Sequence, residues 1–131
     1  MAYDARRMRR SIITLALAAA LALPAAALAG PPFKVRPHTV EAGNVVKVDG
    51  KPGGGCGEGS TVTIYSRAFK SDHEFAGVPA VFAKVRHDGR FTKHVRIPAS
   101  RPSGDYSVGA RCGGGNLGAR TLHVVHGQGG A

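Results

Sequence analysis

The chain of 131 residues carries 18 Lys and Arg against 8 Asp and Glu, which gives a formal net charge of +10 at neutral pH. This length suits one domain rather than several. The sequence has no tryptophan, and its five Phe and three Tyr form no ladder for stacking bases, so a nucleic-acid-binding role is disfavoured.

The first 29 residues have the three-part layout of a secretory signal peptide. Four arginines between residues 6 and 10 precede an apolar run over residues 12–23, which Pro24 then interrupts. Ala27-Leu28-Ala29 places small residues at the two positions that a signal peptidase reads. We therefore expect cleavage after Ala29, localisation in the cell envelope or outside the cell, and no stable membrane span after cleavage.

Two alternatives for this N-terminal segment stay open. The apolar stretch approaches the ~18 residues that can cross a bilayer, which allows an uncleaved anchor. Arg9-Arg10, followed by apolar residues, also fits a twin-arginine signal in place of the general secretory route. Neither alternative changes the compartment.

The exported part of the chain stays basic after cleavage. Removing residues 1–29 lowers Lys plus Arg from 18 to 14 and Asp plus Glu from 8 to 7, which leaves a net charge of +7. Such a charge favours contact with anionic partners such as wall polymers, phospholipid head groups or nucleic acid. The charge alternatively serves only to keep the protein in solution.

Both cysteines, Cys56 and Cys112, lie in the exported part. An even pair in a small domain of an oxidising compartment predicts a disulfide. No CxxC pair occurs and no histidine stands at a short motif spacing from either cysteine, which disfavours metal binding or catalysis by these thiols. Closing a loop of about 57 residues stabilises a fold by roughly 4 kcal/mol in the chain-entropy model.

From Gly30 onward, short runs with period-two alternation are separated by Gly, Pro and Asx clusters, which predicts an all-β domain without helices. The predicted strands are Phe33–Arg36, Val45–Asp49, Thr61–Phe69, Ala80–Arg86, Phe91–Ile97, Asp105–Cys112 and Arg120–Val125. Strands spaced by about ten residues predict a single immunoglobulin-like sandwich of about seven antiparallel strands over residues 30–126. A cleaved signal helix precedes it, and residues 127–131 form a flexible tail.

The immunoglobulin topology makes two local predictions. The loop that contains Cys56 and the end of the strand that contains Cys112 should lie at the same end of the sandwich, so the disulfide would join adjacent loops at one pole. Tyr106, near the start of that strand, is a candidate for the tyrosine corner, in which the hydroxyl bonds back to upstream backbone. Its spacing differs from the antibody pattern, because Cys112 follows six residues later rather than two.

His87-Asp88-Gly89 determines the register of a predicted hairpin. A two-residue loop would pair apolar with polar side chains, whereas a three-residue loop pairs like with like and gives Gly89 the left-handed position. The second register pairs Arg86 with Arg90, Val85 with Phe91 and Val81 with Val95. It places five basic side chains on one outer face beside Phe82: Lys84, Arg86, Arg90, His94 and Arg96. This face is either a candidate anion-binding face or a solvated surface whose positive charge Asp88 partly offsets.

Other motifs indicate neither catalysis nor a cofactor. Residues 113–118 satisfy G-x-G-x-x-G, but a predicted strand follows them instead of the helix that a dinucleotide site needs. The glycine-rich stretch 53–59 lacks the Gly-Lys-Ser/Thr end of a phosphate loop. Asp72-His73-Glu74 are consecutive and rarely converge on one ion, and no nucleophile elbow occurs. We therefore predict no metal site, no cofactor and no enzymatic activity.

Three turn and core motifs carry a resemblance: Val35-Arg36-Pro37, the segment 41–50 and the segment 104–108. They resemble the immunoglobulin-like domains of secreted and surface proteins of actinobacteria, over nearly all of the exported chain. This resemblance implies a fold rather than an activity. It implies a non-catalytic structural or adhesive module at the bacterial cell envelope. The partner would be an anionic surface polymer or another surface protein, and the oligomeric state is left open.

The opening strands also resemble the chromoprotein carriers of the neocarzinostatin family. That resemblance implies an alternative function, a secreted carrier that holds a small apolar ligand in a cleft of the sandwich. Those carriers have two disulfides, whereas this chain can form only one.

Overall fold

The computed structural model describes residues 32–126, and this part of the chain is all-β. The predicted signal peptide (1–29) and tail (127–131) lie outside the described residues. Within residues 32–126, no helix has the length and apolar character that crossing a membrane requires. The strands are β1 (Phe33–Arg36), β2 (Thr39–Glu41), β3 (Val45–Gly50), β4 (Thr61–Tyr65), β5 (His73–Phe75), β6 (Val78–Lys84), β7 (Phe91–Arg96), β8 (Gly104–Cys112) and β9 (Gly115–Val125).

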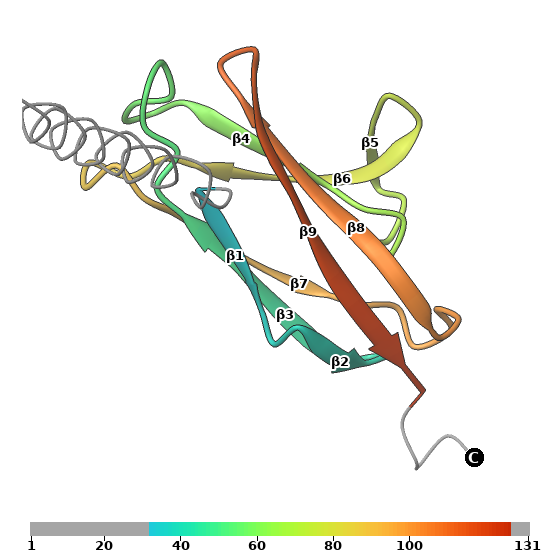
Figure 1. Ribbon diagram of the computed structural model, residues 1–131. Helices are drawn as coiled ribbons and strands as arrows, with labels where there is room; N and C mark the ends of the chain where they lie inside the picture. Colours follow the sequence, from blue (N-terminus) through green and yellow to red (C-terminus); the bar gives the residue numbers. More distant parts are fainter. Residues whose placement is uncertain (1–31, 127–131) are drawn as a thin grey trace, which may run out of the picture. The chain divides into compact units, whose positions relative to one another are not determined.

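The strands form two sheets that pack face to face (Figure 1). A three-stranded sheet has the order β1-β3-β7, and a six-stranded sheet has the order β2-β9-β8-β4-β6-β5. All neighbours are antiparallel except β2, which runs parallel to β9. Placing β1, β3 and β7 in one sheet and β4, β8 and β9 in the other reproduces the division of an immunoglobulin-like sandwich. The predicted fold class is confirmed.

Two short strands were not predicted, and two predicted strands have an end that lies more than two residues from the observed one. β2 and β5 each contain three residues. The strand predicted to reach Phe69 ends at Tyr65, because Ser66 turns the chain: its Oγ accepts a hydrogen bond from the Ala68 N–H at 3.1 Å. The last strand begins at Gly115 rather than Arg120. Gly113 and Gly114, both at positive φ, form a two-residue turn that lets β9 start at once.

The predicted turn around residues 87–89 has the expected closure. The Arg86 N–H donates to the Arg90 carbonyl oxygen at 2.8 Å, and the Gly89 N–H donates to the Arg86 carbonyl oxygen at 2.9 Å. Gly89 has a φ of 80°, in the left-handed region that favours glycine.

The hairpin ladder predicted beyond this turn is wrong, because β6 and β7 belong to different sheets. The Val85 N–H donates to the Ser60 carbonyl oxygen, and the Val85 carbonyl accepts from the Gly59 N–H, both at 2.9 Å. The backbone of Val85 is therefore engaged with the chain entering β4, and Phe91 instead pairs with Gly50 on β3. Alternation identified the inward face of each strand correctly, but it carries no information about which strand lies alongside.

The core lies between the two sheets and is filled by large side chains. Six of them expose at most 1% of their surface: Phe33, Phe69, Phe91, Ile64, Ile97 and Leu122. Burial of such a side chain contributes about 1.5–3 kcal/mol to folding. Arg120 on β9 adds a polar link between the layers, because its Nε donates to the carbonyl oxygen of Phe33 on β1 at 3.0 Å.

Strand β7 forms one edge of the three-stranded sheet. Lys93 pairs with Val48, which is fully buried, so Lys93 occupies an inward position of this edge strand and is half-buried. An apolar residue would be the usual choice at such a position.

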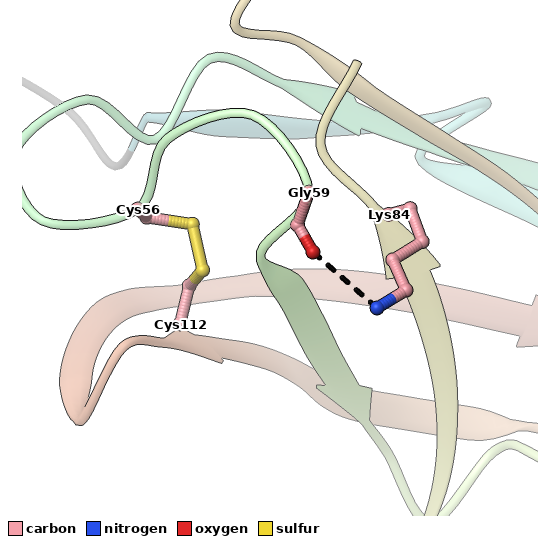
Figure 2. Close-up of a disulfide and its surroundings, with 4 residues drawn as sticks. All are labelled: Cys56, Gly59, Lys84 and Cys112. Atoms are coloured by element: carbon pink, nitrogen blue, oxygen red, sulfur yellow. Dashed lines mark hydrogen bonds between the residues drawn. A yellow bond between two sulfur atoms is a disulfide. The ribbon is translucent and has the colours of Figure 1, made fainter.

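The disulfide joins Cys56, in the loop between β3 and β4, to Cys112 at the end of β8 (Figure 2). The two Cα atoms are 5.7 Å apart, and both cysteines are buried. Lys84 Nζ donates to the carbonyl oxygen of Gly59 on the same loop at 3.3 Å (Figure 2). The predicted pairing, and its position at one pole of the sandwich, are confirmed.

The tyrosine corner is also confirmed. The Tyr106 hydroxyl donates to the carbonyl oxygen of Pro102 at 2.7 Å, four residues upstream. This bond attaches the β7–β8 connection to the start of β8.

Removing the disulfide should lower stability without changing the fold. We expect the double variant Cys56→Ser/Cys112→Ser to lose about 4 kcal/mol of unfolding free energy, because the unfolded chain regains the freedom of a long loop. Urea denaturation followed by circular dichroism measures the difference. A loss below about 1 kcal/mol would show that the loop is restrained by other contacts.

Removing the Tyr106 hydroxyl should have a smaller effect. Tyr106→Phe keeps the ring and deletes the bond to Pro102, so we expect a loss of about 1 kcal/mol in the same assay. Tyr65→Phe is the matched control, and we expect it to change stability by less than half as much. Equal losses in both variants would contradict the role given to the corner.

Candidate anion-binding face

The three strands β1, β3 and β7 turn apolar side chains toward the core and basic side chains outward. Phe33 and Val35 on β1, for example, are buried, and the residues that alternate with them are exposed. The outward basic residues of the three strands, named the basic face below, are Lys34, Arg36, Lys47, His94 and Arg96.

The strand register brings three members of the basic face into one row. Arg36 lies opposite Lys47, and Lys47 lies opposite His94. Adjacent strands are about 4.8 Å apart, so neighbours in the row stand close together. Like charges directly opposite each other, such as those of Arg36 and Lys47, are unfavourable in a sheet, and a bound anion would remove that cost.

Asp49 is the single acidic side chain on β1, β3 and β7, strands that are all within the described residues. Arg36 Nη2 lies 3.2 Å and 3.3 Å from the two Asp49 carboxylate oxygens. The Arg36 side chain is 55% exposed and that of Asp49 is 18% exposed. Arg36 therefore remains accessible to a ligand, and one carboxylate leaves the basic face with a clear positive excess.

One end of the basic face is hollowed. A cavity of about 330 Å³ there is lined by four basic residues, Lys34, Arg36, Lys51 and Arg90, together with Asp49 and the backbone around Pro32 and Gly50. Its volume lies at the lower end of the range for small-ligand sites, ~300–1,000 Å³. The arrangement can therefore receive an anionic group of a larger molecule.

The structure brings four of the five predicted site residues to this sheet. His94 and Arg96 lie on the basic face, and Arg90 lines the hollow. Arg86 Nη1 donates to Thr92 Oγ1 on β7 at 3.1 Å. Lys84 does not join this group. It lies on β6 of the other sheet, opposite Thr61, and its ammonium donates a hydrogen bond to the carbonyl oxygen of Gly59.

Sequence reasoning missed four basic residues of this region: Lys34, Arg36, Lys47 and Lys51. The signal for the first three was present, because each stands between or beside buried apolar residues in an alternating strand. Their relation to His94 and Arg96 comes only from the strand order. One nitrogen of the Arg96 guanidinium is already hydrogen-bonded within the protein, since Nη1 donates to the carbonyl oxygen of Gly43 at 2.6 Å.

Asp88 organises the turn beside the hollow. Its Oδ1 accepts a hydrogen bond from the Arg90 backbone N–H at 2.9 Å and lies 3.7 Å from Arg86 Nε. The Arg90 N–H, and then the charge of Arg86, lower the pKa of the Asp88 carboxyl below its ordinary value of 3.8.

Metal-ligating side chains do not gather in the described region. Within residues 32–126, no three His, Cys, Asp or Glu side chains lie together in a way that would hold a metal ion. His123 Nδ1 on β9 forms a hydrogen-bonded pair with Asp105 Oδ1 on β8.

Comparison with known proteins supports the fold alone. No protein family and no curated protein matches the chain. An α2-macroglobulin from Salmonella matches with a TM-score of 0.52 and 20% identity, over 76% of this chain and 7% of that one. The DNA glycosylase AlkC from Pseudomonas fluorescens matches with a TM-score of 0.40 and 17% identity, over 72% of this chain and 31% of that one. The second likeness is too low to bear on fold or function.

The Asp88 carboxyl should titrate below pH 3.8 in the folded protein. Because its folded pKa is lower than its unfolded pKa, its stabilising effect is complete above the unfolded pKa and is lost as the pH falls through the folded one. An NMR titration of the carboxyl carbon should give the lowered midpoint. Arg86→Gln, which removes one nearby charge, should raise that midpoint. A wild-type midpoint at or above 3.8 would contradict the assignment.

Proposed function

We propose that this protein is an exported, non-catalytic immunoglobulin-like module that binds an anionic polymer of the cell surface through its basic face. The observation that supports the proposal is the row of Arg36, Lys47 and His94 across three strands, beside a hollow lined by four basic residues. Asp49 alone opposes this charge on these strands. A polymer suits the arrangement better than a small ion, because the charges are spread along a sheet.

A polyanion would bind through the whole basic face rather than through one contact. Exposed side chains such as those of Lys34 and Arg36 gain little from any single ion pair, typically ~0–1 kcal/mol. A polyanion contacts several at once and displaces its own counterions, so the small terms add and the affinity depends on salt.

Two further observations favour an exported module. The disulfide between Cys56 and Cys112 fits an oxidising compartment, as does the signal-like segment at the N-terminus. The sequence resemblance to immunoglobulin-like domains of actinobacterial surface proteins suggests the cell envelope as the setting. A structural or adhesive role belongs to the same proposal.

The alternative, a small-ligand carrier of the neocarzinostatin type, is less well supported. Such a carrier needs an apolar cleft between the sheets. Phe69, Phe91 and Ile97 expose none of their surface and fill the space that a ligand would need. The polymer-binding function therefore stands as the proposal.

Charge reversal on the basic face should weaken binding to a polyanion. The affinity for a polyanion falls as the salt concentration rises. We expect Lys34→Glu/Lys47→Glu to make the slope of log affinity against log salt less steep by about two, because two ion contacts are lost. Retention of residues 30–131 on immobilised teichoic acid between about 0.05 and 0.5 M NaCl measures it, since screening at the upper value removes most of the attraction.

The matched control is Lys70→Glu/Lys84→Glu. It changes the net charge by the same amount, but at positions outside the basic face. We expect this pair to alter retention much less. Equal weakening by both pairs would mean that net charge alone drives binding, and the proposed site would then be wrong. Retention that ignores salt would contradict the function itself.

A further inference from the structure

The outer face of the six-stranded sheet carries a cluster of aromatic rings on the opposite layer from the basic face. The cluster, named the aromatic face below, comprises Tyr65, His73, Phe75 and Phe82. The ring centroids of Tyr65 and Phe75 are 5.0 Å apart, and those of His73 and Phe82 are 5.4 Å apart. Phe82 is 42% exposed, and because its ring lies against that of His73 it belongs to a patch rather than standing alone.

The Tyr65 ring lies against the backbone of the neighbouring strand. Gly109 on β8 is its partner in the register, and a Cβ at that position would lie 2.5 Å from Tyr65 Cζ and 2.6 Å from Cε2. Only glycine leaves room for the ring there. The aromatic surface therefore extends from β5 across β6 and β4 to β8.

One hollow borders Tyr65, and another borders Phe75. The first, of about 240 Å³, is lined by Tyr65, Tyr106 and Val78, and by the polar residues Arg67, Asp105 and Ser107. The second, of about 320 Å³, is lined by Phe75, Thr61, Thr63, Arg111 and the turn at residues 112–114. Ser107 and Arg111 are four residues apart on β8, which corresponds to about 13 Å along an extended strand.

One charged side chain of each hollow is held in place by a neighbour. Asp105 is hydrogen-bonded to His123 Nδ1 on the neighbouring strand. Arg111 has its guanidinium carbon 5.5 Å from the Phe75 ring centroid, and its Nη2 donates to the carbonyl oxygen of Gly114 at 3.2 Å. The first hollow thus combines aromatic residues with a fixed carboxylate acceptor, and the second combines an aromatic ring with a fixed guanidinium donor.

We propose that the aromatic face binds a neutral oligosaccharide chain. A pyranose ring presents an apolar C–H face, which packs on aromatic rings, and a rim of hydroxyl groups, which pair with carboxylate, guanidinium and hydroxyl groups. The first hollow contains one acidic and one basic side chain, so its charges balance and an uncharged ligand is favoured. Because Ser107 in one hollow and Arg111 in the other stand about 13 Å apart along β8, the two hollows together suit several linked sugars rather than one.

This site is independent of the proposed polyanion-binding function, because it uses the other sheet. The experiment is isothermal titration of residues 30–131, with the disulfide intact, against hexasaccharides of N-acetylglucosamine, glucose and mannose. We expect at least one of the three to bind with millimolar affinity or better, a level that several aromatic and hydrogen-bonding contacts provide.

Variants then locate the site. Tyr65→Ala should weaken binding about tenfold, since it deletes the central ring. Tyr65→Phe should retain most of the affinity because it keeps the ring, and Asp105→Asn should weaken binding about fivefold through lost hydroxyl pairing. Lys34→Glu/Lys47→Glu, on the basic face, should leave sugar binding unchanged.

Several results would overturn the proposal. It fails if none of the hexasaccharides binds, or if binding occurs but survives both Tyr65→Ala and Asp105→Asn. It also fails if a proline-rich peptide binds in a Tyr65-dependent way while the sugars do not. If Tyr65→Ala does not fold, Asp105→Asn and Arg111→Gln, which change exposed or half-buried polar groups, decide the question in its place.

Discussion

The packing of two apolar sheet faces against each other is the constraint from which the other features follow. Val46 and Val48 on one sheet, and Ile64, Val108 and Leu122 on the other, expose none of their surface. Because successive side chains of a strand point to opposite faces, filling the core determines what each sheet presents outward. One sheet is left with basic residues and the other with aromatic rings, so a single alternation produces two different surfaces.

Features that depend on local sequence were predictable. Period-two alternation located most strands to within two residues, Gly89 marked the turn, and the cysteines and Tyr106 were placed correctly. The ends of β4 and β9 were not, because Ser66 and the Gly113-Gly114 turn act over two or three residues inside patterns that continue past them. β2 and β5 each have three residues, which is too few for a period-two pattern to be recognised in the sequence.

Neighbours in space were much less predictable than strands. Alternation assigned Val85 and Phe91 to the core, yet it could not show that they reach it from opposite layers. The row of Arg36, Lys47 and His94 joins segments distant in the chain, and only the strand order brings them together. The aromatic face has the same origin, since the position of Tyr65 depends on Gly109 in a strand far along the sequence.

Lys93 has a consequence for how copies of this module coexist. Strand β7 ends its sheet with backbone groups open on one side, the arrangement that invites another polypeptide to add as a further strand. Lys93 occupies an inward position of that strand, so an incoming chain would trap its ammonium away from water. That burial is unfavourable enough to keep the edge unoccupied. Copies of the module brought close together can thus touch through side chains without adding a strand at the β7 edge.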